Sequence, residues 1–212
     1  MREMLPGVPV LGGDPAGGFE DTALLTELGV DYLLSVHFPY KFPSALLRAP
    51  AIGCLNLHPA WLPFNRGWHT PSWAIYEKTP YGATLHWIDA GIDSGDIAIR
   101  RRLDVKPSDT AHSLYQRVLQ LEQALLSEAV PLMIEKRLPR LPQERGGSAH
   151  TKRQLQGIQR LDLTRTAPTE EILDRLRALT TNRRDEGAYF EIEGVRYYVR
   201  IEIEAEESPY ES

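Results

Sequence analysis

The sequence has 212 residues, a formal net charge of -5 at neutral pH and one cysteine. Its 42% hydrophobic and 25% charged residues are typical of a globular protein with one main domain, and the acidic balance argues against a nucleic-acid backbone as the partner. No apolar run is long enough for a membrane span or a secretory signal, so we expect a cytoplasmic protein. The lone Cys54 excludes an intramolecular disulfide and a multi-cysteine zinc site.

The first part of the chain alternates helix and strand patterns. Gly29 ends an initial helix, and two apolar runs of strand length follow, separated by a short helical stretch. The predicted elements are a helix over 21–28, a strand over 30–36, a helix over 45–48 and a strand over 52–57. The order strand, helix, strand favours a parallel pair of strands.

The middle of the chain predicts two more strands and the longest helix. We expect a loop over 61–67, a helix over 71–77, strands over 82–89 and 97–105, and a long helix over 113–136. The stretch AGIDSGD between the two strands is too short for a crossover helix, which predicts antiparallel pairing. One stripe of the long helix is apolar, at Leu114, Val118, Leu121, Leu125 and Ala129.

The chain divides into three regions. Residues 1–137 form the predicted core, 138–160 a Pro- and Gly-rich linker or a loop draped over that core, and 161–212 a small C-terminal region. Within the C-terminal region we expect a helix over 169–179 and a β-hairpin formed by 188–192 and 195–203. The sequence therefore predicts an α/β fold with a mixed sheet and a small appendage of one helix and a hairpin.

Asn56 and His58 are the most informative pair of residues. They lie two positions apart at the end of a predicted strand, so both side chains project from one face, at the edge where open α/β sheets bind ligands. An amide can donate a hydrogen bond to a developing oxyanion while an imidazole handles a proton, a combination that suits acyl transfer. The structural alternative is that both residues simply finish a strand.

An acidic turn, AGIDSGDI, lies between the next two predicted strands. Asp93 or Asp96 could orient His58 and stabilise its charge, whereas the structural alternative is a β-turn that uses Asp and Gly for their backbone preferences. The histidines form no close pair at helical metal-ligand spacing, and the sequence has no glycine-rich phosphate loop. We therefore predict no metal, no ATP hydrolysis and no dinucleotide redox chemistry.

The run NLHPAWLPFNRGWHTPSWAIYEKTPYGATLHWIDAGIDSGDI combines the motifs Asn-x-His-Pro, Leu-Pro-x-x-Arg-Gly, Gly-x-Thr-x-His and an Asp-x-Gly turn. As a set, over residues 30–136, they resemble the 10-formyltetrahydrofolate-dependent formyltransferases, which include methionyl-tRNA and sugar-nucleotide N-formyltransferases. The resemblance implies a Rossmann-like open mixed sheet. Family members usually carry a strand, a helix and a strand ahead of the segment PGVPVLGGD, so we expect the first strands to be missing here and neighbouring strand edges to be exposed.

The roles of the site residues are implied by the same resemblance. Asn56 and a protonated His58 would stabilise the oxyanion, and Asp93 would keep His58 charged or relay protons. The donor, 10-formyltetrahydrofolate, is expected between the stretch HFPYKFP (residues 37–43) and the turn over 88–96, against His37, Phe38, Pro39, Tyr40, Ile88, Asp89, Gly91 and Asp93. The acceptor is expected against Pro63, Asn65, Arg66, Gly67, Trp68, Thr84 and His86. Arg66 and Trp68 suit a diphosphate and a base, although a surface loop explains them equally well.

Within the family, two segments resemble most closely the members that formylate a nucleotide-linked amino sugar. They are the motif LPFNRG and the tail LDLTRTAPTEEILDRLRALTTNRRDEGAYFEIEGVRYYV. We expect such an amine as the acceptor, and we rank tRNA below it because the tail is short and the chain acidic. Two alternative functions are consistent with the same motifs. One is a formyltetrahydrofolate hydrolase that uses water as the nucleophile, and the other is a truncated, non-catalytic folate-binding remnant. The aromatic hairpin either pairs with a second copy to form a homodimer or packs back on its own domain, which we favour slightly.

Overall fold

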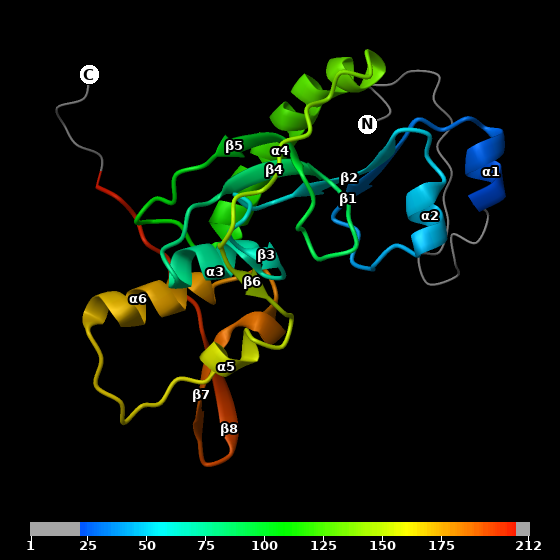
Figure 1. Ribbon diagram of the computed structural model, residues 1–212. Helices are drawn as coiled ribbons and strands as arrows, with labels where there is room; N and C mark the ends of the chain where they lie inside the picture. The colour runs from blue at the N-terminus through cyan, green and yellow to red at the C-terminus, as the bar shows by residue number, and fades with distance from the viewer. Residues whose placement is uncertain (1–21, 207–212) are drawn as a thin grey trace.

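The computed structural model describes residues 22–206, with side chains described from residue 25 onward. Its centre is a sheet in the order β1-β2-β4-β5, made of Tyr32–Val36, Gly53–His58, Gly82–Trp87 and Ile97–Arg102 (Figure 1). β1 pairs with β2 in parallel, whereas β2 with β4 and β4 with β5 are antiparallel. The predicted open mixed sheet is confirmed, and so is the antiparallel pairing across the acidic turn.

Two short helices, α1 (Thr22–Glu27) and α2 (Ser44–Arg48), lie beside the β1 end of the sheet in Figure 1. Both helices, and the strands β1 and β2, lie within two residues of their predicted ends. Among the described residues, β1 is an edge strand that pairs with β2 and with no strand on its other side. The expectation of missing first strands concerns residues 1–21, which lie outside the described part of the chain.

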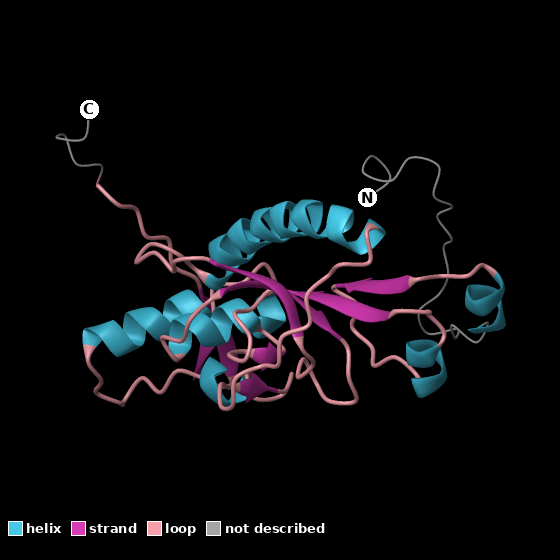
Figure 2. Ribbon diagram, turned by 45° about the horizontal axis from the view of Figure 1, so that its top comes forward, coloured by secondary structure: helices cyan, strands magenta, loops and turns pink. Residues whose placement is uncertain are grey.

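The long helix α4 (Ala111–Ile134) covers one face of the sheet, as Figure 2 shows. A capping box begins it: the Thr110 hydroxyl accepts from the Ser113 N–H, and the Ser113 hydroxyl accepts from the Thr110 N–H. The predicted apolar stripe faces the sheet, with Leu121 partly buried and Leu114, Val118, Leu125 and Ala129 fully buried. Each buried leucine contributes about 1.5–3 kcal/mol, so this stripe attaches the helix to the sheet.

Residues 138–150, which we call the strap, cross the core rather than standing apart from it. The indole N–H of Trp87 donates to the Pro139 carbonyl over 2.8 Å. At the end of the strap, β6 (Ala149–His150) pairs in parallel with β3 (Arg66–Gly67). These two short strands were not predicted, because a two-residue strand carries no periodicity. The strap therefore ties the segment after the long helix to the loop after β2.

A second, smaller core joins the C-terminal region to the rest of the chain. In it α3 (Thr70–Tyr76) packs on α6 (Thr169–Ala178), next to the short helix α5 (Gln156–Gln159). Its buried apolar residues are Trp73, Leu155, Leu179 and Ala188. The C-terminal region is therefore held against the helix that follows the candidate site.

A hairpin of β7 (Ala188–Ile192) and β8 (Val195–Val199) follows the short 3-10 helix η1 (Arg184–Glu186) and projects from the molecule in Figure 1. The hairpin itself is as predicted, but its second strand ends before residue 203, because the last pair joins Ala188 to Val199. None of the helices within residues 22–206 is long and apolar enough to cross a membrane.

Candidate active site

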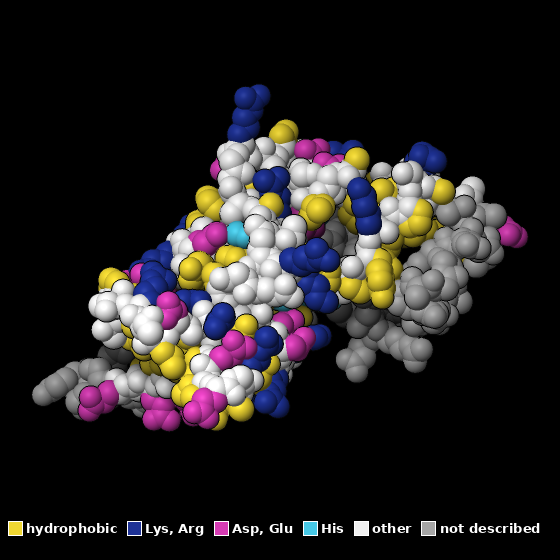
Figure 3. Space-filling model, turned by 90° about the horizontal axis from the view of Figure 1, so that it is seen from below, with side chains coloured by type: hydrophobic (Ala, Val, Ile, Leu, Met, Phe, Trp, Pro, Cys, Tyr) yellow, Lys and Arg dark blue, Asp and Glu magenta, His cyan; other side chains and the backbone are white. Residues whose placement is uncertain are grey.

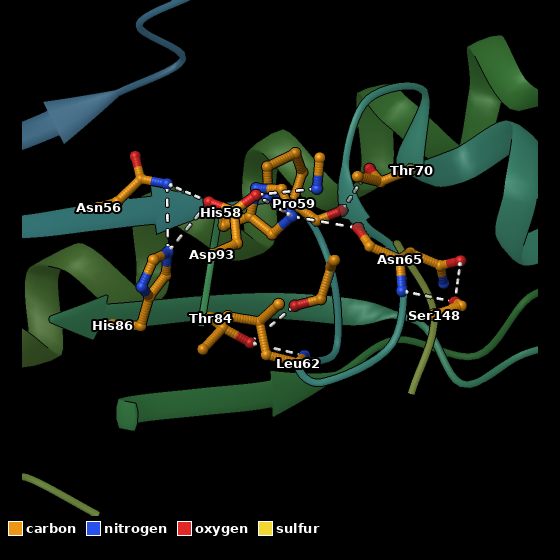
Figure 4. Close-up of polar contacts among 12 residues, drawn as sticks. Asn56, His58, Pro59, Leu62, Asn65, Thr70, Thr84, His86, Asp93 and Ser148 are labelled. Carbon is orange, nitrogen blue, oxygen red and sulfur yellow. Dashed lines mark hydrogen bonds and ion pairs between the residues drawn. The ribbon is translucent and has the colours of Figure 1, made fainter. Parts of the chain in front are cut away.

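The carboxyl end of β2 presents Asn56 and His58 (Figure 4). Alternation along the strand puts the two side chains on one face. Pairing with β4 sets Asn56 opposite His86 and His58 opposite Thr84. His58 is buried, with 6% of its surface exposed. The sheet register therefore brings an amide and two imidazoles together.

Asp93 lies in the turn between β4 and β5 and adopts a left-handed backbone conformation with a φ of 48°. The strap holds this turn, because the Gln143 side-chain amide donates to the carbonyls of Asp93 and Gly95 over 2.9 and 2.6 Å. Glycine is required at position 95, where a β-carbon would lie 1.9 Å from the Trp87 carbonyl oxygen. The turn thus has a defined shape that directs the Asp93 carboxylate at β2.

The Asp93 carboxylate is the centre of the polar network in Figure 4. Its Oδ1 accepts a hydrogen bond from Asn56 Nδ2 over 3.2 Å and lies 3.4 Å from His86 Nε2. Its Oδ2 lies 3.6 Å from His58 Nε2 and accepts the backbone N–H of Gly67 over 2.8 Å. One carboxylate therefore contacts groups from β2, from β4 and from the loop that precedes α3.

Asp96, the other carboxylate of the acidic turn, lies outside this network. Its side chain is 41% exposed and lies 4.0 Å from Arg140 Nε. Its backbone carbonyl accepts the Trp87 N–H over 2.8 Å, which helps to close the turn. Of the two carboxylates that the residue pattern left open, Asp93 is the one in contact with Asn56 and His58.

The side-chain amide of Asn56 is engaged on both of its hydrogens. Nδ2 donates to Asp93 Oδ1 and lies 3.2 Å from His86 Nε2. His86 Nδ1 lies 2.9 Å from the Trp87 carbonyl, and the tautomer with its proton on Nδ1 leaves Nε2 to accept from Asn56. An oxyanion bound at this position must therefore replace Asp93 or His86 as the acceptor of one Asn56 amide hydrogen.

Burial and charge act in opposite directions in the His58–Asp93 pair. Burial lowers the pKa of His58, and the Asp93 carboxylate opposes this effect without overcoming it. Burial works to raise the pKa of Asp93, but His58, His86 and the Gly67 N–H together hold that pKa well below its usual range. These directions favour a carboxylate beside a neutral imidazole at neutral pH, whereas the family resemblance implied a protonated His58 during the reaction.

A cavity of about 540 Å³ opens beside these residues. The residues expected against the donor all line it, namely His37, Phe38, Pro39, Tyr40, Ile88, Asp89, Gly91 and Asp93. Residues 37–43 form one wall, which we call the donor loop, and there the rings of Phe38 and Phe42 stack with centroids 4.7 Å apart. Lys41 Nζ donates to the Ala90 carbonyl over 3.0 Å, which ties the donor loop to the acidic turn. An apolar wall opposite main-chain polar groups suits a planar ligand.

The residues expected against the acceptor divide into two groups. Gly67, Trp68 and His86 line the cavity. Pro63, Asn65, Arg66 and Thr84 do not line it, although the sequence placed them against the acceptor. Two of these side chains are fully buried elsewhere: Asn65 within the loop after β2, and Thr84 on β4 against that same loop.

Asn65 and Thr84 hold that loop in place. Asn65 Nδ2 donates to Thr79 Oγ1 over 2.9 Å, and the Asn65 carbonyl lies 3.2 Å from His58 Nε2. The Thr84 hydroxyl donates to the Ala60 carbonyl over 2.7 Å. The polar atoms of both side chains are hydrogen-bonded within the protein, so these residues position the site without reaching the cavity.

Several cavity residues had no sequence motif to mark them. They are His69 before α3, Tyr115 on α4 and Glu186 from the C-terminal region, whereas Lys41 and Phe42, which also line the cavity, belong to the stretch HFPYKFP expected beside the donor. A smaller pocket of about 220 Å³ continues from His69, Tyr115 and Glu186 toward Thr181 and Asn182. The C-terminal region therefore contributes to the site, which no local pattern could reveal, because α3 and α6 bring these segments together only on folding.

Two further features concern metal-ligand groups among the described residues and charge on one face of the molecule. Within residues 22–206, no group of three or more His, Cys, Asp or Glu side chains is arranged to hold a metal ion. On the face seen in Figure 3, Lys and Arg side chains are interspersed with Asp and Glu. That face therefore presents no continuous field of a single charge.

Two family models match this chain. One is described as Formyl transferase and matches residues 19–130, and the other is described as N-formyltransferase dimerization C-terminal domain and matches residues 154–205. The first covers more than half of the sequence and includes Asn56, His58 and Asp93. The chain therefore belongs to the formyl transferase family, and it is a formyltransferase, as the four motifs indicated.

Relatives of known activity and structure agree with this assignment. The chain is 31% identical over 202 residues to a dTDP-4-amino-4,6-dideoxyglucose formyltransferase from Mycobacterium bovis, covering 95% of this chain and 83% of the relative. A sugar N-formyltransferase from Shewanella sp FDAARGOS_354 superposes with a TM-score of 0.81 at 26% identity, over 90% of this chain and 76% of that one. A formyltransferase from Anoxybacillus kamchatkensis, solved with UDP-4,6-dideoxy-4-formamido-L-AltNAc and tetrahydrofolate, superposes with a TM-score of 0.58 at 30% identity, over 60% of this chain and 68% of that one.

Proposed function

We propose that this protein transfers a formyl group from 10-formyltetrahydrofolate to the primary amine of a nucleotide-linked amino sugar, in the cytoplasm. The observation that carries the proposal is the convergence of Asn56, His58 and Asp93 on one cavity. The Mycobacterium bovis relative is named for an amino sugar nucleotide, and the Anoxybacillus structure contains a formamido sugar nucleotide with tetrahydrofolate. These relatives support a folate donor and a sugar-nucleotide acceptor for this chain.

In the proposed reaction the neutral amine attacks the formyl carbon, so that a carbon–nitrogen bond forms and the carbonyl electrons move to oxygen. Asn56 stabilises this oxyanion by donating an amide hydrogen to it. In doing so Asn56 gives up its hydrogen bond to either Asp93 or His86. The carbon–nitrogen bond to N10 of the folate then breaks, and N10 takes a proton. The products are an N-formyl sugar nucleotide and tetrahydrofolate, with no covalent enzyme intermediate.

His58 moves the proton between the two nitrogens. Its Nε2 lies near two acceptors, the Asn65 carbonyl and Asp93 Oδ2, so the proton of the neutral ring belongs there. Nδ1 is then the nitrogen that accepts a proton from the attacking amine. Asp93 stabilises the imidazolium formed in this step, because its carboxylate stays ionised across the physiological range.

The donor fits between the donor loop and the acidic turn. The stacked rings of Phe38 and Phe42 offer an apolar wall to a pterin, and the turn offers main-chain donors and acceptors. On the other side, Trp68 is 41% exposed at the cavity, and Lys152 Nζ lies 5.2 Å from its ring centroid. An exposed indole with an adjacent cation suits the base and the diphosphate of the acceptor.

The direct test is an assay with 10-formyltetrahydrofolate and dTDP-4-amino-4,6-dideoxyglucose. We expect tetrahydrofolate to appear together with a sugar nucleotide that is heavier by one formyl group in mass spectrometry. Release of formate at the same rate with and without the amine would support the hydrolase instead. No turnover of the donor with a panel of amino sugar nucleotides would contradict the proposal.

We also propose that the protein forms a homodimer through the β7–β8 hairpin. The family model matched by residues 154–205 is described as a dimerization domain. The hairpin exposes the large apolar side chains Ile192, Val195, Tyr197 and Tyr198. Apolar side chains of this size on a two-stranded projection favour burial against a second copy.

A further inference from the structure

One carboxylate on the apolar face of α4 is buried beneath the donor loop. Glu122 is 3% exposed, and its Oε2 lies 2.7 Å from His37 Nε2. Its other oxygen, Oε1, is buried and has no hydrogen-bond partner within the described part of the chain. A buried carboxylate is unfavourable unless it is paired, so its one interaction, with His37, needs an explanation.

His37 joins this carboxylate to the cavity. It is the first residue of the donor loop, directly after β1, and it lines the cavity. Its φ of 52° lies in the left-handed region, which is uncommon for a residue other than glycine. The His37–Glu122 contact is therefore well placed to fix the point at which the donor loop leaves the sheet.

Tyr115 completes the arrangement from the same helix. It lies seven residues, or about two turns, before Glu122, and its hydroxyl lies 3.3 Å from His37 Nδ1. The two rings meet edge to face, with centroids 5.9 Å apart. Both nitrogens of the His37 ring are thus engaged by side chains of α4.

The charges around His37 favour its protonated form. The hydrogen bond that His37 donates to Glu122 raises the pKa of His37, against the opposing effect of partial burial. Burial raises the pKa of Glu122, and His37 opposes that rise. The other titratable groups facing the pair are Tyr115 on α4, Tyr81 before β4 and His58 at the end of β2.

We propose that Glu122 is a positioning residue for the formyl donor: by pairing with His37 it anchors the donor loop in the conformation that binds folate. This inference rests on the proposed function, since it assigns the donor cavity to folate. A charged His37 donates from both ring nitrogens, so the Tyr115 oxygen accepts one of these bonds. The Tyr115 O–H is then left to donate into the cavity, which Tyr115 lines.

The test compares Glu122→Gln with Glu128→Gln, a control on the same helix whose carboxylate is 46% exposed and pairs with Arg101. Binding of 5-formyltetrahydrofolate, a stable stand-in for the donor, is measured by calorimetry at several pH values. At about pH 8 the Glu122→Gln dissociation constant should rise about tenfold. At about pH 5.5 it should return toward the native value, because a protonated His37 can again donate a charge-assisted bond to the glutamine oxygen. The control should bind like the native protein throughout.

A role confined to packing would weaken binding equally at every pH, and that result would overturn the inference. Should Glu122→Gln fail to fold, His37→Gln replaces a partly exposed side chain and is expected to bind weakly at all pH values. Native affinity in His37→Gln would likewise overturn the inference. Absence of folate binding by the native protein would contradict the proposed function itself, which separates the two failures.

Discussion

The backbone N–H of Gly67 donates to Asp93 Oδ2 over 2.8 Å, and this hydrogen bond joins two loops that leave different strands. Two residues earlier, the Asn65 carbonyl lies 3.2 Å from His58 Nε2. The short segment 65–67 therefore touches both members of the His58–Asp93 pair. The loop after β2 sets their separation as much as the sheet does.

Asp93→Asn should abolish most turnover while leaving the fold intact. The substitution keeps the shape of the side chain but removes the charge that stabilises an imidazolium at His58. We expect kcat/KM to fall by about 10²- to 10⁴-fold, with an unchanged circular dichroism spectrum. Asp96→Asn is the matched control in the same turn, since Asp96 is 41% exposed and lies outside the network. Full activity of Asp93→Asn would remove Asp93 from the mechanism.

The pH dependence of turnover should reflect the lowered pKa of His58. Burial favours the neutral imidazole, so the base stays available below its ordinary pKa of 6.5. The acid limb of kcat/KM should therefore lie below pH 6.5, in the direction that burial sets. In Asp93→Asn the pKa of His58, followed by NMR, should fall further because Asp93 raises it.

The same shift predicts how acid affects stability. In the unfolded chain His58 binds its proton at an ordinary pKa, whereas the folded protein binds it at lower pH. The unfolded state thus holds more protons between these two values, so the free energy of unfolding should decrease as the pH falls through that interval. Denaturant titrations of the native protein and of His58→Gln should show a smaller decrease in the variant.

Gly67→Ala should lower both stability and activity. Gly67 has a φ of 88°, and a β-carbon there would lie 2.3 Å from the His150 carbonyl oxygen. We expect a loss of about 1–3 kcal/mol together with a weakened bond to Asp93. Gly146→Ala separates the two causes, because Gly146 has a similar φ of 101° with nothing within 4 Å of the added carbon. Equal losses in both variants would mean that the clash with the strap is not important.

Cys54 should be unreactive in the native protein. It is 4% exposed, and burial raises the pKa of its thiol to about 11. Since the thiolate is the reactive form, a thiol reagent at neutral pH should modify it only after unfolding in guanidinium. Rapid modification of the folded protein would show that the α2 side of the sheet opens readily.

The hairpin proposal predicts a change of assembly. Tyr197→Lys places a charge on a strand whose Tyr197 is 46% exposed, and it should convert a dimer to a monomer in analytical ultracentrifugation. Ile134→Lys is the control, because Ile134 is 71% exposed at the far end of α4. A native protein that sediments as a monomer at all concentrations would contradict the dimer.

The sequence by itself determined the strands and helices around the site, the pairing of Asn56 with His58 and the family. These features depend on local periodicity, on alternation along a strand and on short motifs, all of which act over a few residues. The donor residues were expected from the family resemblance alone, and in the structure His37 to Tyr40, Ile88, Asp89 and Gly91 line the cavity.

Only the tertiary structure decided which predicted side chains reach the cavity. The side chains of Asn65 and Thr84 point away from the cavity and make their hydrogen bonds within or against the loop after β2, because buried polar groups need such partners. Tyr115, Glu122 and Glu186, in contrast, come to the site from distant parts of the chain. The charge state of His58 likewise depends on how completely the fold excludes water from it. Burial is a property of the whole packed chain, and for that reason no short segment of sequence contains it.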